Sequence, residues 1–200
     1  MDSTVERLRE AEVGLLTGAV AVGKTTVAER VVGLARRQGL VCGGLLAPAM
    51  MNSCGQKAGI WGVDILSGDR RILARTDSDL GGPQVGVYSF GGAALAWAVD
   101  ILGGAMGACD LLVVDEIGKL ELWRNTGLAP ILPRLASGEV TRSLVLVRDS
   151  LLAELQEKLN PVRQVVFDVC EDNRSTLPLS ILERLAWTQG PVCNRADSRQ

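Results

Sequence analysis

The sequence predicts an α/β fold with three layers, α/β/α, in which helices cover both faces of a mostly parallel sheet and an antiparallel hairpin extends one edge. Three observations support this prediction. Short apolar runs, typical of buried strands, alternate with helical segments. Residues 58–66 and 70–75 flank Ser67-Gly68-Asp69 in a hairpin pattern. A length of 200 residues and a hydrophobic content of 47% fit one globular domain, with a core over residues 12–188 and frayed ends.

The first half of the chain contains one helix among several short strands. Apolar side chains recur at helical spacing after residue 26, and Gly39 ends that pattern. Proline, asparagine and glycine interrupt the chain between residues 47 and 57. The expected elements are a strand at 13–17, a helix at 26–37, a strand at 40–46, a loop at 47–57, the hairpin at 58–75, a glycine-rich loop at 76–84 and a short strand at 85–90.

The second half of the chain alternates more regularly between helix and strand. Pro130 and Pro133 predict that the helix around them is irregular. The expected elements are a helix at 93–102, a strand at 111–114, the irregular helix at 128–135, a strand at 143–147, a helix at 150–158, a strand at 164–169 and a closing helix at 179–187.

A complete phosphate-binding loop lies between the first strand and the first helix. Its pattern is glycine, four residues, glycine, lysine and a hydroxyl residue. Such a loop wraps phosphates with its backbone N–H groups, its lysine contacts the β- and γ-phosphates, and its hydroxyl binds Mg²⁺. We therefore expect Lys24 to act in catalysis and Thr25 to bind the metal. The residues expected to bind nucleotide are Gly18, Ala19, Val20, Ala21, Val22, Gly23, Lys24, Thr25 and Thr26.

Two carboxylates follow the buried strand at residues 111–114. Because the carboxyl ends of parallel strands share one edge of a sheet, Asp115 is expected near the phosphate loop, where it holds Mg²⁺ opposite Thr25. Side chains alternate along a strand, so Glu116 is expected to point elsewhere than Asp115. A carboxylate there can orient the attacking water or accept its proton, which favours hydrolysis and makes Glu116 a candidate catalytic residue.

Composition excludes several other kinds of chemistry. The chain has no histidine, which removes every His-based triad and His-ligated metal site. The net charge of −2 gives no basic footprint for nucleic acid, and no apolar run reaches the ~18 residues of a membrane span. The charged N-terminus does not resemble a signal peptide. The five cysteines are widely spaced and are expected to be reduced thiols in a cytoplasmic protein, with Cys42, Cys109 and Cys170 buried.

The chain resembles the small P-loop nucleoside-triphosphatases first known from thermophiles, which include the animal cancer-related nucleoside-triphosphatase. The matching stretches are residues 18–26, 41–44, 62–65, 72–75, 114–121 and 171–174, and the most specific of them is Asp-Glu-Ile-Gly-Lys followed by Leu-Glu. The resemblance implies a P-loop NTPase fold and Mg²⁺-dependent hydrolysis of ATP, GTP and other nucleoside triphosphates, with loose base preference. The chain departs from the usual pattern at Ala19 and Val20 and at residues 147–149.

The transition state at the γ-phosphate needs additional positive charge, which is often an arginine. Arg148 follows the strand at 143–147 and is expected at the phosphate edge, where it would act in catalysis. Two alternatives to hydrolysis remain open, because the same phosphate-binding loop occurs in proteins with other functions. One is a nucleotide or small-molecule kinase, and the other is a slow nucleotide-dependent switch or adaptor for an unknown protein partner. The chain has no Asn-Lys-x-Asp motif, so guanine-specific switching is not expected.

Overall fold

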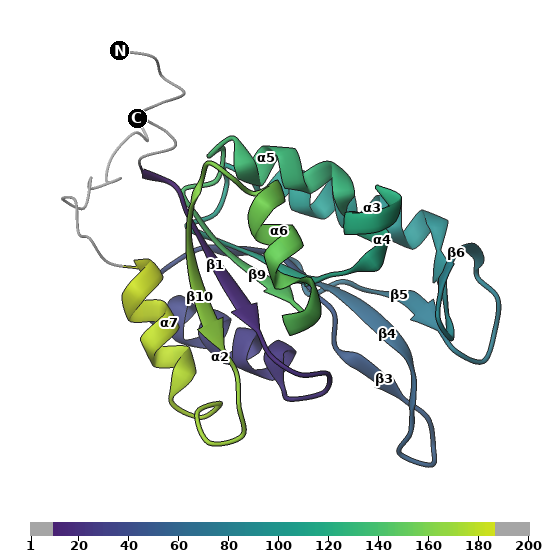
Figure 1. Cartoon of the computed structure of the whole chain (residues 1–200). Helices are drawn as coiled ribbons and strands as arrows, with labels where there is room; N and C mark the ends of the chain where they lie inside the picture. Colours follow the sequence, from purple (N-terminus) through teal and green to yellow (C-terminus); the bar gives the residue numbers. More distant parts are fainter. Residues whose placement is uncertain (1–9, 187–200) are drawn as a thin grey trace, which may run out of the picture.

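A ten-stranded sheet runs through the computed structural model, which describes residues 10–186 (Figure 1). Neighbouring strands follow the order β10-β1-β9-β8-β2-β4-β5-β7-β6, and β3 pairs with β4 outside this path. The strands are β1 (Glu12–Thr17), β2 (Cys42–Leu46), β3 (Ala49–Met51), β4 (Lys57–Asp64), β5 (Arg70–Arg75), β6 (Gly81–Val85), β7 (Tyr88–Gly91), β8 (Leu111–Ile117), β9 (Arg142–Val147) and β10 (Arg163–Asp168).

Strands β10, β1, β9, β8 and β2 are parallel to one another, so their carboxyl ends lie at one edge. This arrangement confirms the predicted α/β class. The predicted hairpin is β4 and β5, which pair in antiparallel fashion beside β2. It belongs to a larger antiparallel extension, because β3, β6 and β7 join it.

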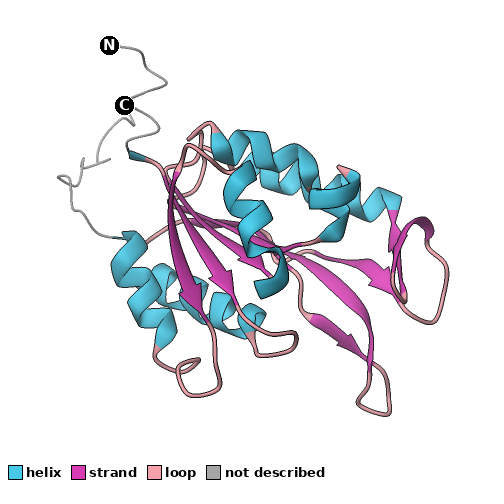
Figure 2. Cartoon of the chain, viewed as in Figure 1, coloured by secondary structure: helices cyan, strands magenta, loops and turns pink. Residues whose placement is uncertain are grey.

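Helices cover the two faces of the sheet, as the cyan and magenta layers of Figure 2 show. On one face lie α2 (Lys24–Arg37) and α7 (Leu177–Ala186), which pack against each other. The other helices are α3 (Gly92–Ala105), α4 (Lys119–Arg124), α5 (Leu132–Ala136) and α6 (Leu152–Lys158), with short 3₁₀ turns η1 (Ala129–Ile131) and η2 (Asp149–Leu151). The break between η1 and α5 confirms the predicted irregular helix.

Strand alternation divides the apolar side chains between two cores. Leu15 and Leu112 belong to the core beneath α3, α5 and α6, whereas Leu16 and Val113 belong to the core beneath α2 and α7. Neighbouring strand residues point to opposite faces, so a continuous apolar run is what a sheet covered on both sides requires. Both layers therefore hold the carboxyl ends of β1, β8 and β9 in fixed positions.

Four elements differ from the predictions. A turn at residues 86–87 breaks the predicted strand at 85–90, and β7 begins after it. Strand β3 lies in the predicted loop at 47–57, and β6 lies mostly in the predicted loop at 76–84. Pro83 is tolerated in β6 because this strand ends the path of the sheet, where one side needs no ladder hydrogen bonds. Helix α4 was not predicted, because its six residues are too few to show a period.

The cysteine prediction holds in part. Cys42 is buried and Cys109 is partly buried, but Cys170 is exposed, so its prediction was wrong. Cys170 follows the end of β10 and lies in the loop before α7, where no helix layer covers it. Trp187, the predicted end of the closing helix, lies outside the described residues, as does Cys193.

Within residues 10–186 no helix is both long and apolar enough to cross a membrane.

Candidate active site

The predicted phosphate loop connects the end of β1 to the start of α2. Gly18 has a φ of 138°, and a Cβ there would lie 2.7 Å from the carbonyl oxygen of Val169, so this turn requires glycine. Gly23 and Ala21 also have positive φ values, of 105° and 64°. The Lys24 ammonium donates hydrogen bonds to the carbonyl oxygens of Gly18 (2.7 Å) and Ala19 (2.9 Å), which curls the loop around it. Burial is the main cause that lowers the pKa of Lys24.

Asp115 lies near the end of β8, beside the first turn of α2. Its Oδ2 accepts a hydrogen bond from the backbone N–H of Ala47 over 2.8 Å, and Thr25 lines the same cavity as this carboxylate. Only 4% of the residue is exposed, and burial raises the pKa of this carboxyl to about 7. The structure thus brings together Thr25 and Asp115, the two residues predicted to bind metal.

Glu116 lies in an irregularity of the sheet. The register between β8 and β9 shifts between Val114 and Ile117, and Glu116 has a φ of 72°, which is uncommon for a residue with a side chain. The shift interrupts strict alternation, so Glu116 and Asp115 line the same cavity. The expectation of strict alternation assumed a regular strand, and the structure replaces it with an irregular one that brings both residues to one cavity.

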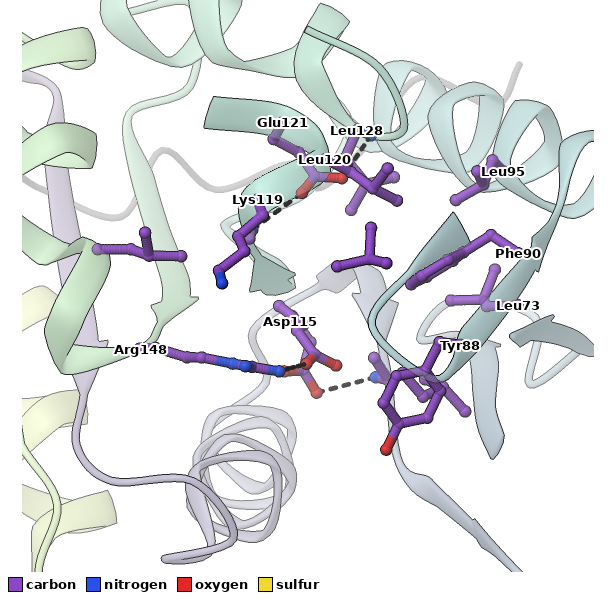
Figure 3. A pocket seen from close by; sticks show the side chains of 16 residues that line it. Leu73, Tyr88, Phe90, Leu95, Asp115, Lys119, Leu120, Glu121, Leu128 and Arg148 are labelled. Carbon is purple, nitrogen blue, oxygen red and sulfur yellow. Dashed lines mark hydrogen bonds and ion pairs between the residues drawn. The ribbon is translucent and has the colours of Figure 1, made fainter. Parts of the chain in front are cut away.

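Arg148 follows β9 at the same edge of the sheet. Its Nη2 donates a hydrogen bond to Oε1 of Glu116 over 3.2 Å, and Figure 3 shows the guanidinium directed toward the two carboxylates. Both side chains are partly exposed, at 41% for Arg148 and 33% for Glu116. Their contact therefore leaves room for each group to meet a ligand.

A cavity of about 580 Å³ unites these residues. Lys24, Thr25, Asp115, Glu116 and Arg148 all line it, although the first two come from α2 and the others from strand ends far along the chain. Of the loop residues predicted to bind nucleotide, Val20, Ala21, Gly23 and Thr26 also line the cavity. Gly18, Ala19 and Val22 shape the loop without lining it.

Three further residues at the site escaped the sequence-based prediction. Lys57 and Tyr88 line the cavity from the antiparallel extension, with the Lys57 ammonium 5.2 Å from the centre of the Tyr88 ring. The Arg174 side chain approaches the loop at Gly23, because a Cβ on Gly23 would lie 3.9 Å from its Cδ. No motif marks Lys57 or Tyr88, and only the matching stretch at 171–174 points to Arg174.

Glu121 stabilises the segment that follows the two carboxylates. The residue is 4% exposed, and its two oxygens accept hydrogen bonds from the backbone N–H groups of Gly118 (2.8 Å) and Leu128 (3.0 Å). Burial raises the pKa of this carboxyl. Glu121 thus holds the start of α4 and the turn after it, which explains the Leu-Glu ending of the acidic motif.

The chemistry of the site suits a hard divalent cation. Magnesium prefers oxygen ligands, and Thr25 and Asp115 supply a hydroxyl and a carboxylate at the phosphate loop. A cation beside Asp115 would offset the burial that raises its pKa. Residues 10–186 contain no group of three or more His, Cys, Asp or Glu side chains that could hold a metal alone. A cation here would therefore need further oxygen ligands from phosphate and water.

The fold and the loop at residues 18–25 are those of the P-loop class of α/β proteins. A family model described as NTPase matches residues 14–182, and the chain belongs to this family. Nucleoside-triphosphatase THEP1 of Methanopyrus kandleri is 32% identical over 180 residues, covering 88% of this chain and 96% of that protein. The protein of the same name from Thermotoga maritima is 31% identical, covering 88% of this chain and 97% of its own length.

Two solved structures share the fold. THEP1 from Aquifex aeolicus superposes with a TM-score of 0.70 at 19% identity, covering 88% of this chain and 99% of that chain. A human cancer-related nucleoside triphosphatase superposes with a TM-score of 0.69 at 24% identity, covering 90% of this chain and 100% of that chain. These likenesses confirm the predicted three-layer α/β fold, and the family membership confirms the resemblance noted in the sequence.

Proposed function

We propose that this protein is a Mg²⁺-dependent hydrolase that converts nucleoside 5'-triphosphates to diphosphates and phosphate with loose base specificity. The observation that carries the proposal is the convergence of Lys24, Thr25, Asp115, Glu116 and Arg148 on one cavity. Relatives that share about a third of the sequence are named nucleoside-triphosphatases, which supports the same activity here. The missing Asn-Lys-x-Asp motif supports the loose base preference, because that motif is associated with guanine selection.

Each residue of the cavity has its own role in the proposed hydrolysis. The loop amides and the Lys24 ammonium bind the β- and γ-phosphates, and Thr25 and Asp115 are the residues that would hold Mg²⁺. When bound, Mg²⁺ would supply positive charge that offsets the negative charge developing on the phosphates. Glu116 orients a water molecule in line with the γ-phosphorus and accepts its proton as the bond to the β-phosphate oxygen breaks. Arg148 stabilises the negative charge on the transferring group.

Phosphate release from ATP, GTP, CTP and UTP tests this proposal when no other substrate is present. We expect release from several of the four nucleotides with Mg²⁺, and loss of release when EDTA removes the metal. Binding of all four nucleotides without any release would overturn hydrolysis. Release from one nucleotide alone would overturn the loose base specificity, and release that persists in EDTA would overturn the metal dependence.

A further inference from the structure

A second cavity, of about 80 Å³, adjoins the 580 Å³ cavity described above on the side of Glu116 and Arg148 (Figure 3). The two cavities share part of their lining, so a molecule in one can touch groups that act in the other. The residues that line both are Ala47, Tyr88, Asp115, Glu116 and Arg148. Hydrolysis in the larger cavity does not require the second cavity, because Glu116 also lines the larger one.

Apolar side chains form most of the wall of the second cavity. They come from the antiparallel extension and from helices α3 and α4, as Figure 3 shows for Leu73, Phe90, Leu95 and Leu120. The buried carboxylate of Glu121 is also in the wall, but both of its oxygens accept backbone hydrogen bonds. A buried water needs two to four polar partners, so the apolar end is better suited to carbon than to water.

Polar groups that can act on a ligand gather at the opposite end. Glu116 and Arg148 stand there beside Asp115, and Figure 3 shows Arg148 entering from the side opposite Phe90 and Leu73. An occupant that matches both ends has an apolar body and one polar group directed at Glu116. A cavity of ~150 Å³ holds a benzene molecule, so about 80 Å³ corresponds to roughly three or four carbon atoms.

We propose that this second cavity binds a small aliphatic alcohol, whose hydroxyl accepts the γ-phosphoryl group in place of water. The alcohol oxygen forms a bond to the γ-phosphorus while the bond from that phosphorus to the β-phosphate oxygen breaks. The hydroxyl proton passes to the Glu116 carboxylate, and the products are a nucleoside diphosphate and an alkyl phosphate. The inference rests on the proposed function, because it uses the same bound triphosphate.

The first part of the test uses butan-1-ol at millimolar concentration with the wild-type protein, ATP and Mg²⁺. Mass spectrometry and phosphorus NMR separate butyl phosphate from inorganic phosphate. We expect the amount of ADP formed to equal the sum of inorganic phosphate and butyl phosphate, with a measurable share as butyl phosphate. Its isomer 1-methoxypropane has a similar shape but no hydroxyl, so it should compete with butan-1-ol and yield no phosphoester.

Two substitutions in one hairpin make a matched pair. Val85 is partly buried and lines the second cavity, whereas Val87 is 72% exposed and lies outside its lining. Val85→Phe should fill the cavity and reduce butyl phosphate formation at least tenfold, while Val87→Phe should leave it within about twofold. Both variants should release phosphate from ATP at the wild-type rate without alcohol, which verifies that the fold and phosphate site are intact.

The outcomes separate this inference from the proposed function. Phosphate release without any butyl phosphate would overturn the inference and leave hydrolysis standing. Equal yields of butyl phosphate from Val85→Phe and Val87→Phe would also overturn it, because the cavity would then play no part. Butyl phosphate without phosphate release in the absence of alcohol would support the inference and overturn hydrolysis.

Discussion

Arg148 and Glu116, which lie 32 residues apart in sequence, form an ion pair over 3.2 Å in the wall that the two cavities share. The pair depends on the irregularity between β8 and β9, because a regular strand would turn Glu116 away from Asp115. Each partner is only partly buried, so a triphosphate and its attacking nucleophile can replace the contact at modest cost. The pair therefore positions two catalytic candidates before the substrate arrives.

Glu116→Gln tests the assignment of the proton acceptor. The amide keeps the size of the side chain and its hydrogen bonding but cannot accept a proton, so we expect kcat to fall by about 10²–10⁴-fold. Binding of a non-hydrolysable ATP analogue should change by less than about threefold, since Glu116 does not hold the phosphates. Single-turnover phosphate release and calorimetric titration measure the two quantities. Wild-type hydrolysis by this variant would refute the assignment.

Arg148→Ala tests the source of positive charge at the γ-phosphate. We expect a loss of about 10²-fold or more in kcat, with partial recovery in Arg148→Lys, because lysine restores the charge but not the planar fork. Arg163→Ala is a matched control, since the exposed Arg163 side chain forms an ion pair with Glu12 at the sheet edge, away from the cavity. Steady-state assays should show the control unchanged. An Arg148→Ala variant as active as this control would exclude a role in catalysis.

Lys24→Ala should abolish tight triphosphate binding. Removal of the ammonium deletes the charge proposed to meet the β- and γ-phosphates and also the hydrogen bonds to the carbonyl oxygens of Gly18 and Ala19. We expect the Kd for ATP to rise by at least about 100-fold in a fluorescence titration. Lys158→Ala, at the exposed end of α6, removes the same charge elsewhere and should leave the Kd unchanged. Equal Kd values for the two variants would contradict the prediction.

The stability of the ligand-free protein should fall as pH rises toward 7. Burial raises the pKa of Asp115 to about 7 in the folded protein, against a reference value of 3.8. Between these two pH values the carboxyl is protonated in the folded state and ionised in the unfolded state, so the folded state binds one more proton. Ionisation then opposes folding, by an amount on the order of a few kcal/mol above pH 7. Urea unfolding from pH 4 to 8 should show this slope in the wild type and lose it in Asp115→Asn.

A matched control separates this effect from other carboxylates. Asp172→Asn, at an exposed position, should retain the wild-type slope between pH 4 and 7. If Asp115→Asn also retained it, burial of Asp115 would not be the cause. Added Mg²⁺ and ATP should oppose the loss of stability near pH 7, because a cation favours the ionised carboxylate.

Much of this architecture could be predicted because its signals are local. The phosphate loop is a contiguous pattern, and the apolar run before Asp115 marks a buried strand. Parallel strand ends meet at one edge, so the proximity of Asp115, Thr25 and Arg148 followed from topology alone. Predictions failed where the sequence preference of a segment differs from the structure that its neighbours impose on it. Strand β6 is an example, because its Pro83 indicates a loop but is tolerated in a strand at the edge of the sheet.

The sequence by itself determined the fold class, the position of the loop expected to bind phosphate and the identity of its lysine and hydroxyl, because these depend on residue type and short spacing. Only the tertiary structure decided that Glu116 shares a cavity with Asp115, that Arg148 pairs with it, and that Lys57 and Tyr88 join them. The same holds for the second cavity. Such features arise from register shifts and from packing between elements far apart in the chain, which no local pattern encodes.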